Sequence, residues 1–115
     1  MKDNQFICSF KIGFPERIYS IYLVTELDEV EEIGETDYQK AKVKIKNLDS
    51  VSIQKTVIHE LVHVWLYEMG HNQAEKQFTN EDVCEIVASS YDFIAFTLME
   101  FMEQYNKLLG KHSKE

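Results

Sequence analysis

Two histidines and a glutamate lie close together in His59-Glu60-Leu61-Val62-His63, within a stretch whose apolar spacing predicts a helix. Side chains four residues apart on a helix project from one face, so both imidazoles can reach a single metal ion. Imidazole nitrogen is a good zinc ligand, and a catalytic zinc keeps an open position for a water whose pKa falls to about 7. Glu60 stands beside the first histidine, where a carboxylate can take that water's proton. The pattern predicts a hydrolytic zinc site with His59 and His63 as ligands and Glu60 as general base.

The residues around this motif argue against a chance pattern on a solvated helix. They are apolar over most of the helix circumference, which predicts a largely buried helix with Trp65 in the core. Buried histidine and glutamate side chains need partners, because desolvating an unpaired polar group is costly, and a metal ion would supply one. The apolar residues are Ile53, Val57, Ile58, Leu61, Val62, Trp65, Leu66 and Met69.

Length and charge limit the class of protein. The 115 residues, 44% of them hydrophobic, make one small domain over 1–115 that can bury roughly two thirds of its unfolded surface. A net charge of −8, from 20 acidic and 12 basic residues, argues against a nucleic-acid partner and favours a basic peptide or protein. Cys8 and Cys84 are the two cysteines, and no apolar run has the length of a signal peptide or membrane span. We expect a cytoplasmic protein with reduced thiols.

The N-terminal half has the composition of strands. Residues 6–12 and 18–25 are rich in β-branched and aromatic types, with turn chemistry at 13–16 between them. Ala41 to Lys46 alternate between apolar residues and lysines, which predicts a strand with one face in water. Exposed lysines suit an edge strand. They either protect that edge from unwanted pairing or border an edge to which an extended peptide substrate adds as a further strand.

The segment from Glu26 to Asp37 collects seven acidic residues. Such a run is typical of a solvated loop or an exposed strand end, and Gly34 within it favours a turn. The alternative function of the run is attraction of a basic substrate. The acidic residues are Glu26, Asp28, Glu29, Glu31, Glu32, Glu35 and Asp37.

Two helices follow the strands. The first is expected from about Val51 to Met69, with Gly70 in the left-handed conformation at its end and an N-cap among Asn47, Asp49, Ser50 and Ser52. Thr79 can cap a second amphipathic helix of about 30 residues. Its apolar positions are Val83, Ile86, Val87, Tyr91, Ile94, Leu98, Phe101, Met102, Tyr105, Leu108 and Leu109, together with Ser90.

A second face of the long helix contains small and acidic residues, and we expect the histidine-bearing helix to pack there. In that arrangement Glu81 could provide the third metal ligand, and Glu85 could ligate the metal or orient a histidine. Without a metal site, both carboxylates would serve solubility and the helix dipole. Cys84 could also bind metal or act as a redox handle, but a small buried side chain is the expected role. The face consists of Glu81, Cys84, Glu85, Ala88, Asp92 and Ala95.

The histidine motif followed by Asn80-Glu81-Asp82-Val83-Cys84-Glu85 resembles the gluzincin metallopeptidases. Their second motif is Asn-Glu-x-x-x-Asp, with the glutamate as third zinc ligand; Glu85 stands where that pattern has Asp. The small size, the strands before the helix and the closing glycine resemble more closely the minimal ImmA/IrrE-like and phage-encoded members. The resemblance implies an α+β, zincin-like fold, in which an N-terminal antiparallel or mixed sheet of about three strands packs on the zinc-binding helix and the long C-terminal helix. It implies Zn²⁺ as cofactor, with His59, His63 and Glu81 as ligands, Glu60 as catalytic base and Glu85 as a second-layer carboxylate.

Three functions are therefore open. The first is a zinc metallopeptidase that hydrolyses a peptide bond through metal-activated water. The second is a zinc-stabilised interaction module, for instance a phage or mobile-element protein, with little or no turnover. The third is a metal-free helical adaptor. For a peptidase, the residues that could stabilise the oxyanion are, by type alone, Tyr67, His71 and Tyr91.

Overall fold

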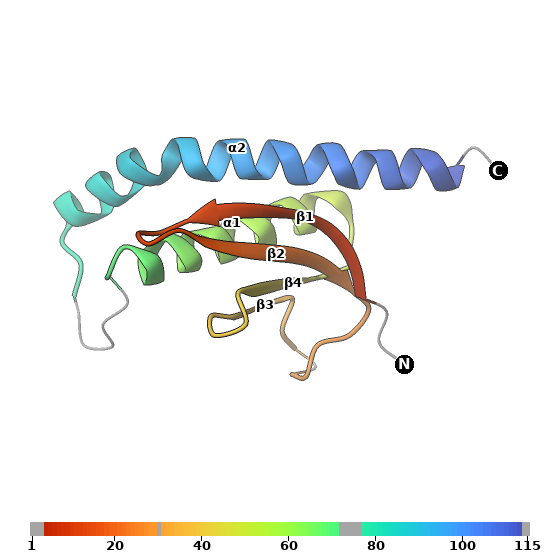
Figure 1. The fold of residues 1–115 in the computed structure, drawn as a ribbon, viewed down its shortest axis with the longest axis horizontal. Helices are drawn as coiled ribbons and strands as arrows, with labels where there is room; N and C mark the ends of the chain where they lie inside the picture. The colour runs from red at the N-terminus through yellow and green to blue at the C-terminus, as the bar shows by residue number, and fades with distance from the viewer. Residues whose placement is uncertain (1–3, 30, 72–76, 114–115) are drawn as a thin grey trace.

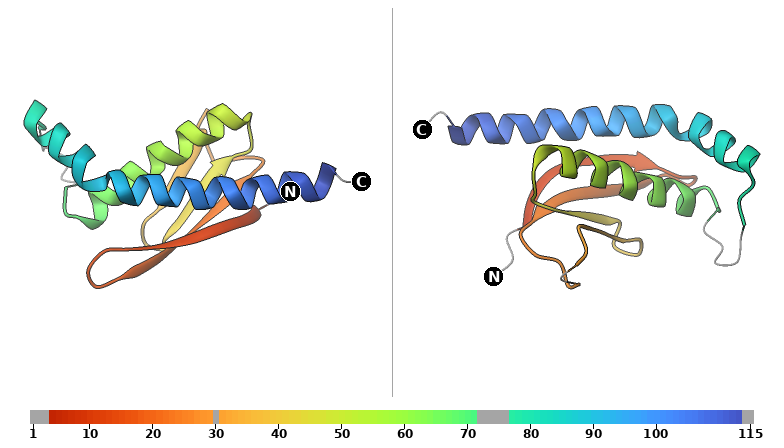
Figure 2. Two further views of the ribbon diagram at one scale, coloured as in Figure 1. Left: turned by 90° about the horizontal axis from the view of Figure 1, so that it is seen from above. Right: turned by 180° about the vertical axis from the view of Figure 1, so that it is seen from behind.

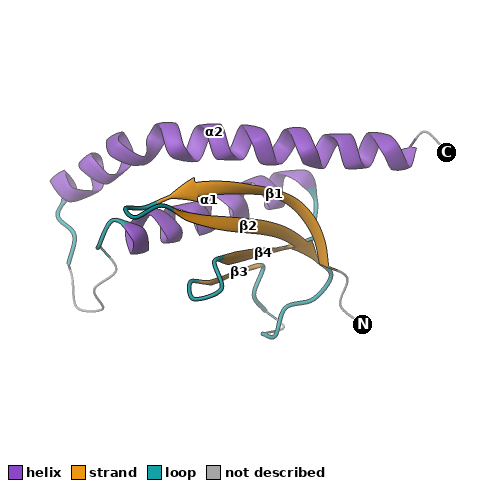
Figure 3. Ribbon diagram, in the orientation of Figure 1, coloured by secondary structure: helices purple, strands orange, loops and turns teal. Residues whose placement is uncertain are grey.

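The computed structural model describes residues 4–29, 31–71 and 77–113 of the chain. The fold is α+β, as the sequence predicts, and has a four-stranded sheet where about three strands were expected (Figure 1, Figure 3). The elements in order are β1 Asn4–Ile12, β2 Arg17–Val24, β3 Gly34–Asp37, β4 Lys42–Lys46, α1 Ser50–Glu68 and α2 Asn80–Ser113. No helix in the described ranges is both long enough and apolar enough to cross a membrane.

The sheet is mixed and is covered by helices on one face. Its strand order is β1-β2-β4-β3, with β2 and β4 parallel and the two outer pairs antiparallel. Helix α1 packs against β3 and β4, and α2 packs against β1 and crosses α1 (Figure 2). The core between the layers includes Tyr19, Ile21, Ile45, Ile53 and Phe101, all fully buried.

The lysine-rich strand is present as predicted, but its predicted place at the edge of the sheet is wrong. Residues 42–46 form β4, which lies between β2 and β3, so neither of its edges is open to a peptide. The acidic segment provides the missing neighbour: in the register of β3 with β4, Glu35 lies opposite Lys44 and Asp37 lies opposite Lys42. Opposite charges facing each other across a strand pair stabilise it. The lysines therefore lie beside carboxylates instead of marking a free edge.

The capping residues of the two helices are among those that the sequence predicts. Asp49 caps α1 by accepting a hydrogen bond from the backbone N–H of Ser52 at 2.9 Å, and this bond is the main cause of the lowered pKa of Asp49. Gly70 has a φ of +81°, the left-handed conformation that glycine adopts without strain. At the start of α2, Thr79 and Asp82 each accept a hydrogen bond from the other's backbone N–H.

The packing face of α2 differs from the prediction. The small and acidic face expected to meet α1 is solvent-exposed at Glu81, Cys84, Glu85, Ala88 and Asp92, so Cys84 is not a buried side chain. The core receives much of the apolar stripe that the sequence predicts, among it Ile86, Phe101 and Tyr105, together with Phe93. Bulky apolar groups bury more surface than alanine or cysteine, which favours this rotation of the helix. It leaves Val83, Val87 and Tyr91 of the predicted apolar stripe exposed.

A polar cluster joins the strands to the end of α1. The Glu68 carboxylate, 7% exposed, accepts hydrogen bonds from Arg17 Nη1 at 2.6 Å and from the Tyr19 hydroxyl at 2.5 Å. Burial first, and the Glu68 carboxylate second, raise the pKa of Tyr19. Arg17 also donates to the backbone carbonyl of Tyr38, in the turn between β3 and β4. One carboxylate therefore holds α1, β2 and this turn together.

We expect Glu68→Gln to lower the free energy of unfolding by about 1–2 kcal/mol, because hydrogen bonds to a charged group contribute about 1.5–3 kcal/mol and the amide keeps part of this. Urea denaturation of both proteins measures the difference. Glu103→Gln, at an exposed position of α2, is the control and should change nothing. Equal stability losses in the two variants would contradict the role given to this cluster.

Candidate metal site

The two motif histidines point their ring nitrogens at each other. The Nε2 atoms of His59 and His63 are 3.1 Å apart, and the rings meet edge to face at 72°. A tetrahedral zinc ion with bonds of about 2.0–2.1 Å holds two ligand nitrogens about 3.3 Å apart. At 3.1 Å the two nitrogens can share either a proton or a metal ion. The separation of the two nitrogens is therefore within a few tenths of an ångström of that in a zinc site.

Glu60 lies inside the protein, whereas both histidines are exposed. The prediction of a largely buried helix therefore holds for the glutamate and for Trp65, and it is wrong for the two imidazoles. Glu60 is 7% exposed, and its Oε1 accepts a hydrogen bond from the Thr36 hydroxyl of β3 at 2.6 Å. The buried carboxylate is thus fixed by a partner 24 residues earlier in the chain.

Gly34 lets β3 approach α1 closely enough for this contact. A Cβ atom on Gly34 would lie 2.6 Å from Thr56 Cγ2 and 2.9 Å from Glu60 Oε2, both shorter than real contacts allow. The expected turn at Gly34 is wrong, because the residue begins a strand. Glycine is present here for close packing, a role that turn rules do not detect.

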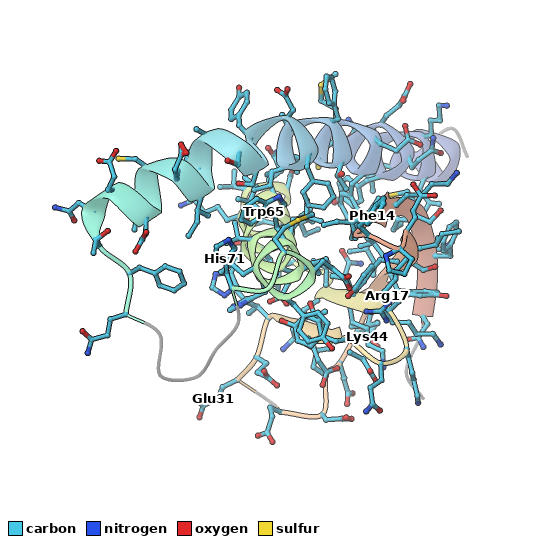
Figure 4. All side chains as sticks on the ribbon, turned by 60° about the vertical axis from the view of Figure 1, so that its left-hand side comes forward. Phe14, Arg17, Glu31, Lys44, Trp65 and His71 are labelled. Carbon is cyan, nitrogen blue, oxygen red and sulfur yellow. The ribbon has the colours of Figure 1, made fainter. Side chains whose placement is uncertain are left out.

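The histidines, Glu60 and β3 border a cavity of about 650 Å³. Three acidic residues of the 26–37 run reach it, and the one basic residue among those that line it is Lys55. Glu31 lies on the opposite side of α1 from α2 (Figure 4). The lining residues are Glu31, Glu32, Ile33, Gly34, Glu35, Thr36, Tyr38, Ser52, Lys55, Thr56, His59, Glu60 and His63.

The predicted carboxylate ligands are not beside the histidines. Within residues 4–29, 31–71 and 77–113, no third histidine, cysteine, aspartate or glutamate joins His59 and His63 in a group that could hold a metal. Glu81 is exposed in the first turn of α2, which begins beyond the end of α1 (Figure 1). Glu85 lines a separate cavity with Trp65 and His71. Two of the three predicted ligands lie close together and line one cavity with the predicted base, whereas Glu81 and Glu85 are not among the residues that line it.

Sequence patterns do not identify Tyr38, which lines the histidine cavity. Its ring stacks on Tyr67 of α1, with centroids 4.2 Å apart. Burial first, then the Glu60 carboxylate and Tyr67, raise the pKa of Tyr38, so the phenol stays protonated. Tyr38 follows an acidic run with no motif around it, and its position depends on the fold.

The oxyanion candidates named by type lie elsewhere. Tyr67 supports Tyr38 and lines the neighbouring cavity formed by the β3–β4 turn. His71 stacks on Trp65 at a centroid distance of 5.6 Å, at the end of α1 and below α2 (Figure 4). Tyr91 is 65% exposed on α2. None of the three lines the cavity of the histidines.

Comparison with known proteins gives no relative: no family model, no curated protein and no solved structure matches this chain. The resemblance to gluzincins therefore depends on the two motifs and the other sequence features named above.

We expect Thr36→Val to lower the free energy of unfolding by about 2 kcal/mol, because it leaves the buried Glu60 carboxylate without its hydroxyl donor. Thr36→Ser keeps the hydroxyl and should retain most of the stability. Denaturation of the three proteins in urea at neutral pH makes the comparison. A serine variant as unstable as the valine variant would assign the loss to packing and not to the hydrogen bond.

Proposed function

We propose that this protein is a zinc-dependent metallopeptidase of the minimal gluzincin type, similar to ImmA/IrrE-like and phage-encoded HExxH enzymes. The observation that supports this most directly is the convergence of His59 Nε2 and His63 Nε2 at 3.1 Å on the rim of a cavity. Zinc bound there would supply an acidified water and polarise a substrate carbonyl. The reduced thiols expected of Cys8 and Cys84 are consistent with a cytoplasmic protein.

Glu60 is the general base in this proposal. Its carboxylate lines the same cavity as both imidazoles, and the Thr36 hydroxyl fixes one of its oxygens. The carboxylate takes a proton from the attacking water and delivers it to the departing amine as the peptide bond breaks. Because Thr36 engages Oε1, the other oxygen, Oε2, is the one assigned to proton transfer.

Glu81 is proposed as the third zinc ligand, with Glu85 supporting the site, on the strength of the Asn80–Glu85 motif alone. In the described structure Glu81 is exposed and apart from the histidines, so its ligation requires a change in the first turns of α2. The exposed apolar side chains of that segment, Val83 and Val87, are consistent with a segment that gains contacts when it moves.

The proposed substrate is a basic peptide or protein segment. β3 forms the edge of the sheet beside the cavity, so an extended chain can add to it by backbone hydrogen bonds. Glu31, Glu32 and Glu35 surround the same cavity, and their carboxylates would attract lysine or arginine side chains of that chain.

We expect the double variant Glu31→Gln/Glu32→Gln to lower kcat/KM for Lys- or Arg-containing peptides by roughly threefold at low salt, because two attractive charges are lost. The difference should shrink at high ionic strength, where exposed charges are screened. Glu26→Gln/Glu29→Gln is the matched control: it changes the net charge equally, at residues of the same loop that do not line the cavity. The same loss in both double variants would show an effect of net charge and not of the two carboxylates that line the cavity.

A second function is a zinc-stabilised interaction module with little or no turnover. The observation in its favour is that a catalytic zinc has three protein ligands, and the described residues bring no third ligand to the two histidines. In such a protein the zinc would serve binding or folding, and Glu60 would be dispensable for partner binding.

We expect Glu60→Gln to bind zinc as the parent does and to cleave a mixed peptide library at least 100-fold more slowly, because the proton acceptor is lost. Zinc affinity is measured by competition with a chromophoric chelator, and cleavage by mass spectrometry of the library. In the same titration, Glu81→Ala should bind zinc at least tenfold more weakly, and His59→Ala should do the same.

The outcomes separate the two functions. Zinc binding with equal cleavage by the parent and Glu60→Gln, or with no cleavage by either, would exclude the peptidase and leave the interaction module. Failure of the parent to bind zinc would exclude both. Unchanged zinc affinity in Glu81→Ala would remove that residue from the ligand set.

A further inference from the structure

Four of the side chains that line the histidine cavity carry a hydroxyl group. Three of these hydroxyls already donate hydrogen bonds to protein acceptors: Thr36 to Glu60 Oε1 at 2.6 Å, Thr56 to the carbonyl of Ser52 at 2.7 Å, and Ser52 to Asp49 Oδ2 at 2.9 Å. The fourth belongs to Tyr38, whose hydroxyl has no acceptor among the described residues. It is the hydroxyl left to serve a molecule bound in the cavity.

Tyr38 is held at two points, at its ring and at its backbone carbonyl. Tyr67 stacks against it with an interplanar angle of 15°, and Tyr67 lies one helical turn after His63. Arg17 donates to the Tyr38 backbone carbonyl and is itself anchored by Glu68. A donor whose position is fixed before the ligand arrives loses little entropy when it forms a hydrogen bond.

We propose that Tyr38 is a catalytic residue that donates its hydroxyl hydrogen bond to the substrate oxygen on which negative charge develops. As the water oxygen bonds to the carbonyl carbon, the π electrons of the C=O bond move onto the carbonyl oxygen, and one proton of the water passes to Glu60. Tyr38 keeps its proton and stabilises the new negative charge through the hydrogen bond. Its raised pKa is consistent with a group that donates without ionising.

This inference rests on the proposed peptidase function, because it assigns the oxyanion donor of the same cavity. The competing donor is Lys55, which also lines the cavity and lies one turn before His59. Lys55 is an exposed lysine with a flexible side chain, so its ammonium group is not fixed in advance. The stacked phenol is the better-placed donor on this ground.

The test compares the zinc-loaded parent with Tyr38→Phe, using phosphoryl-Leu-Trp as the probe, a tetrahedral phosphorus compound with negatively charged oxygens. The plain dipeptide Leu-Trp, which lacks such oxygens, is the reference ligand. Tyr22→Phe is the control variant, since it removes a tyrosine hydroxyl outside the cavity. Lys55→Met tests the competing donor, and calorimetry measures zinc and ligand binding for all four proteins.

We expect Tyr38→Phe to bind zinc normally and phosphoryl-Leu-Trp about tenfold or more weakly, because one hydrogen bond to a charged oxygen is lost. Binding of Leu-Trp should not change, and Tyr22→Phe should match the parent. Equal phosphoryl-Leu-Trp affinity in Tyr38→Phe and parent, or a loss confined to Lys55→Met, overturns the inference. A parent that binds zinc but not phosphoryl-Leu-Trp also counts against it, whereas a parent that binds no zinc refutes the proposed function itself.

Discussion

The contact between the Glu60 carboxylate and the Thr36 hydroxyl is the constraint on which the site depends. A buried carboxylate without a donor would be costly, so α1 and β3 must stay close enough for this hydrogen bond of 2.6 Å. Gly34 permits that approach, because any side chain there would collide with Thr56 and Glu60. The same approach closes one wall of the cavity and leaves the two imidazoles on its rim. Packing between one helix and one short strand thus determines where the histidine cavity lies.

The charges of the N-terminal half have a second role that follows from strand order. The acidic segment adds β3 beside β4, where Glu35 and Asp37 lie opposite Lys44 and Lys42. Residues that appear in the sequence as a solvated run and a protected edge are therefore cross-strand partners. Glu31 and Glu32, in the middle of the run, line the histidine cavity. The acidic residues at the end of the run thus face lysines within the sheet, and those in its middle border the cavity.

Local patterns in the sequence were sufficient to predict both helices, their caps, the first hairpin and the pairing of two histidines. Each depends on spacing within about one or two turns, as with Asp49 at the start of α1 and Gly70 at its end. The errors concern contacts between distant segments. The order of β4 and β3, the rotation of α2 that exposes Cys84, and the entry of Tyr38 into the cavity depend on how surfaces pack, and helical or strand period does not encode this. The separation of Glu81 from the histidines belongs to the same class, since it depends on where the first turns of α2 lie.

X-ray absorption at the zinc edge of the loaded protein shows whether the two imidazoles hold one metal ion. We expect two imidazole ligands, with zinc–nitrogen distances of about 2.0–2.1 Å and oxygen ligands completing the coordination. The spectrum of a His59→Ala/His63→Ala variant should show no imidazole scattering from this site. A loaded parent with one imidazole or none, or with a spectrum that the double substitution leaves unchanged, would contradict the claim.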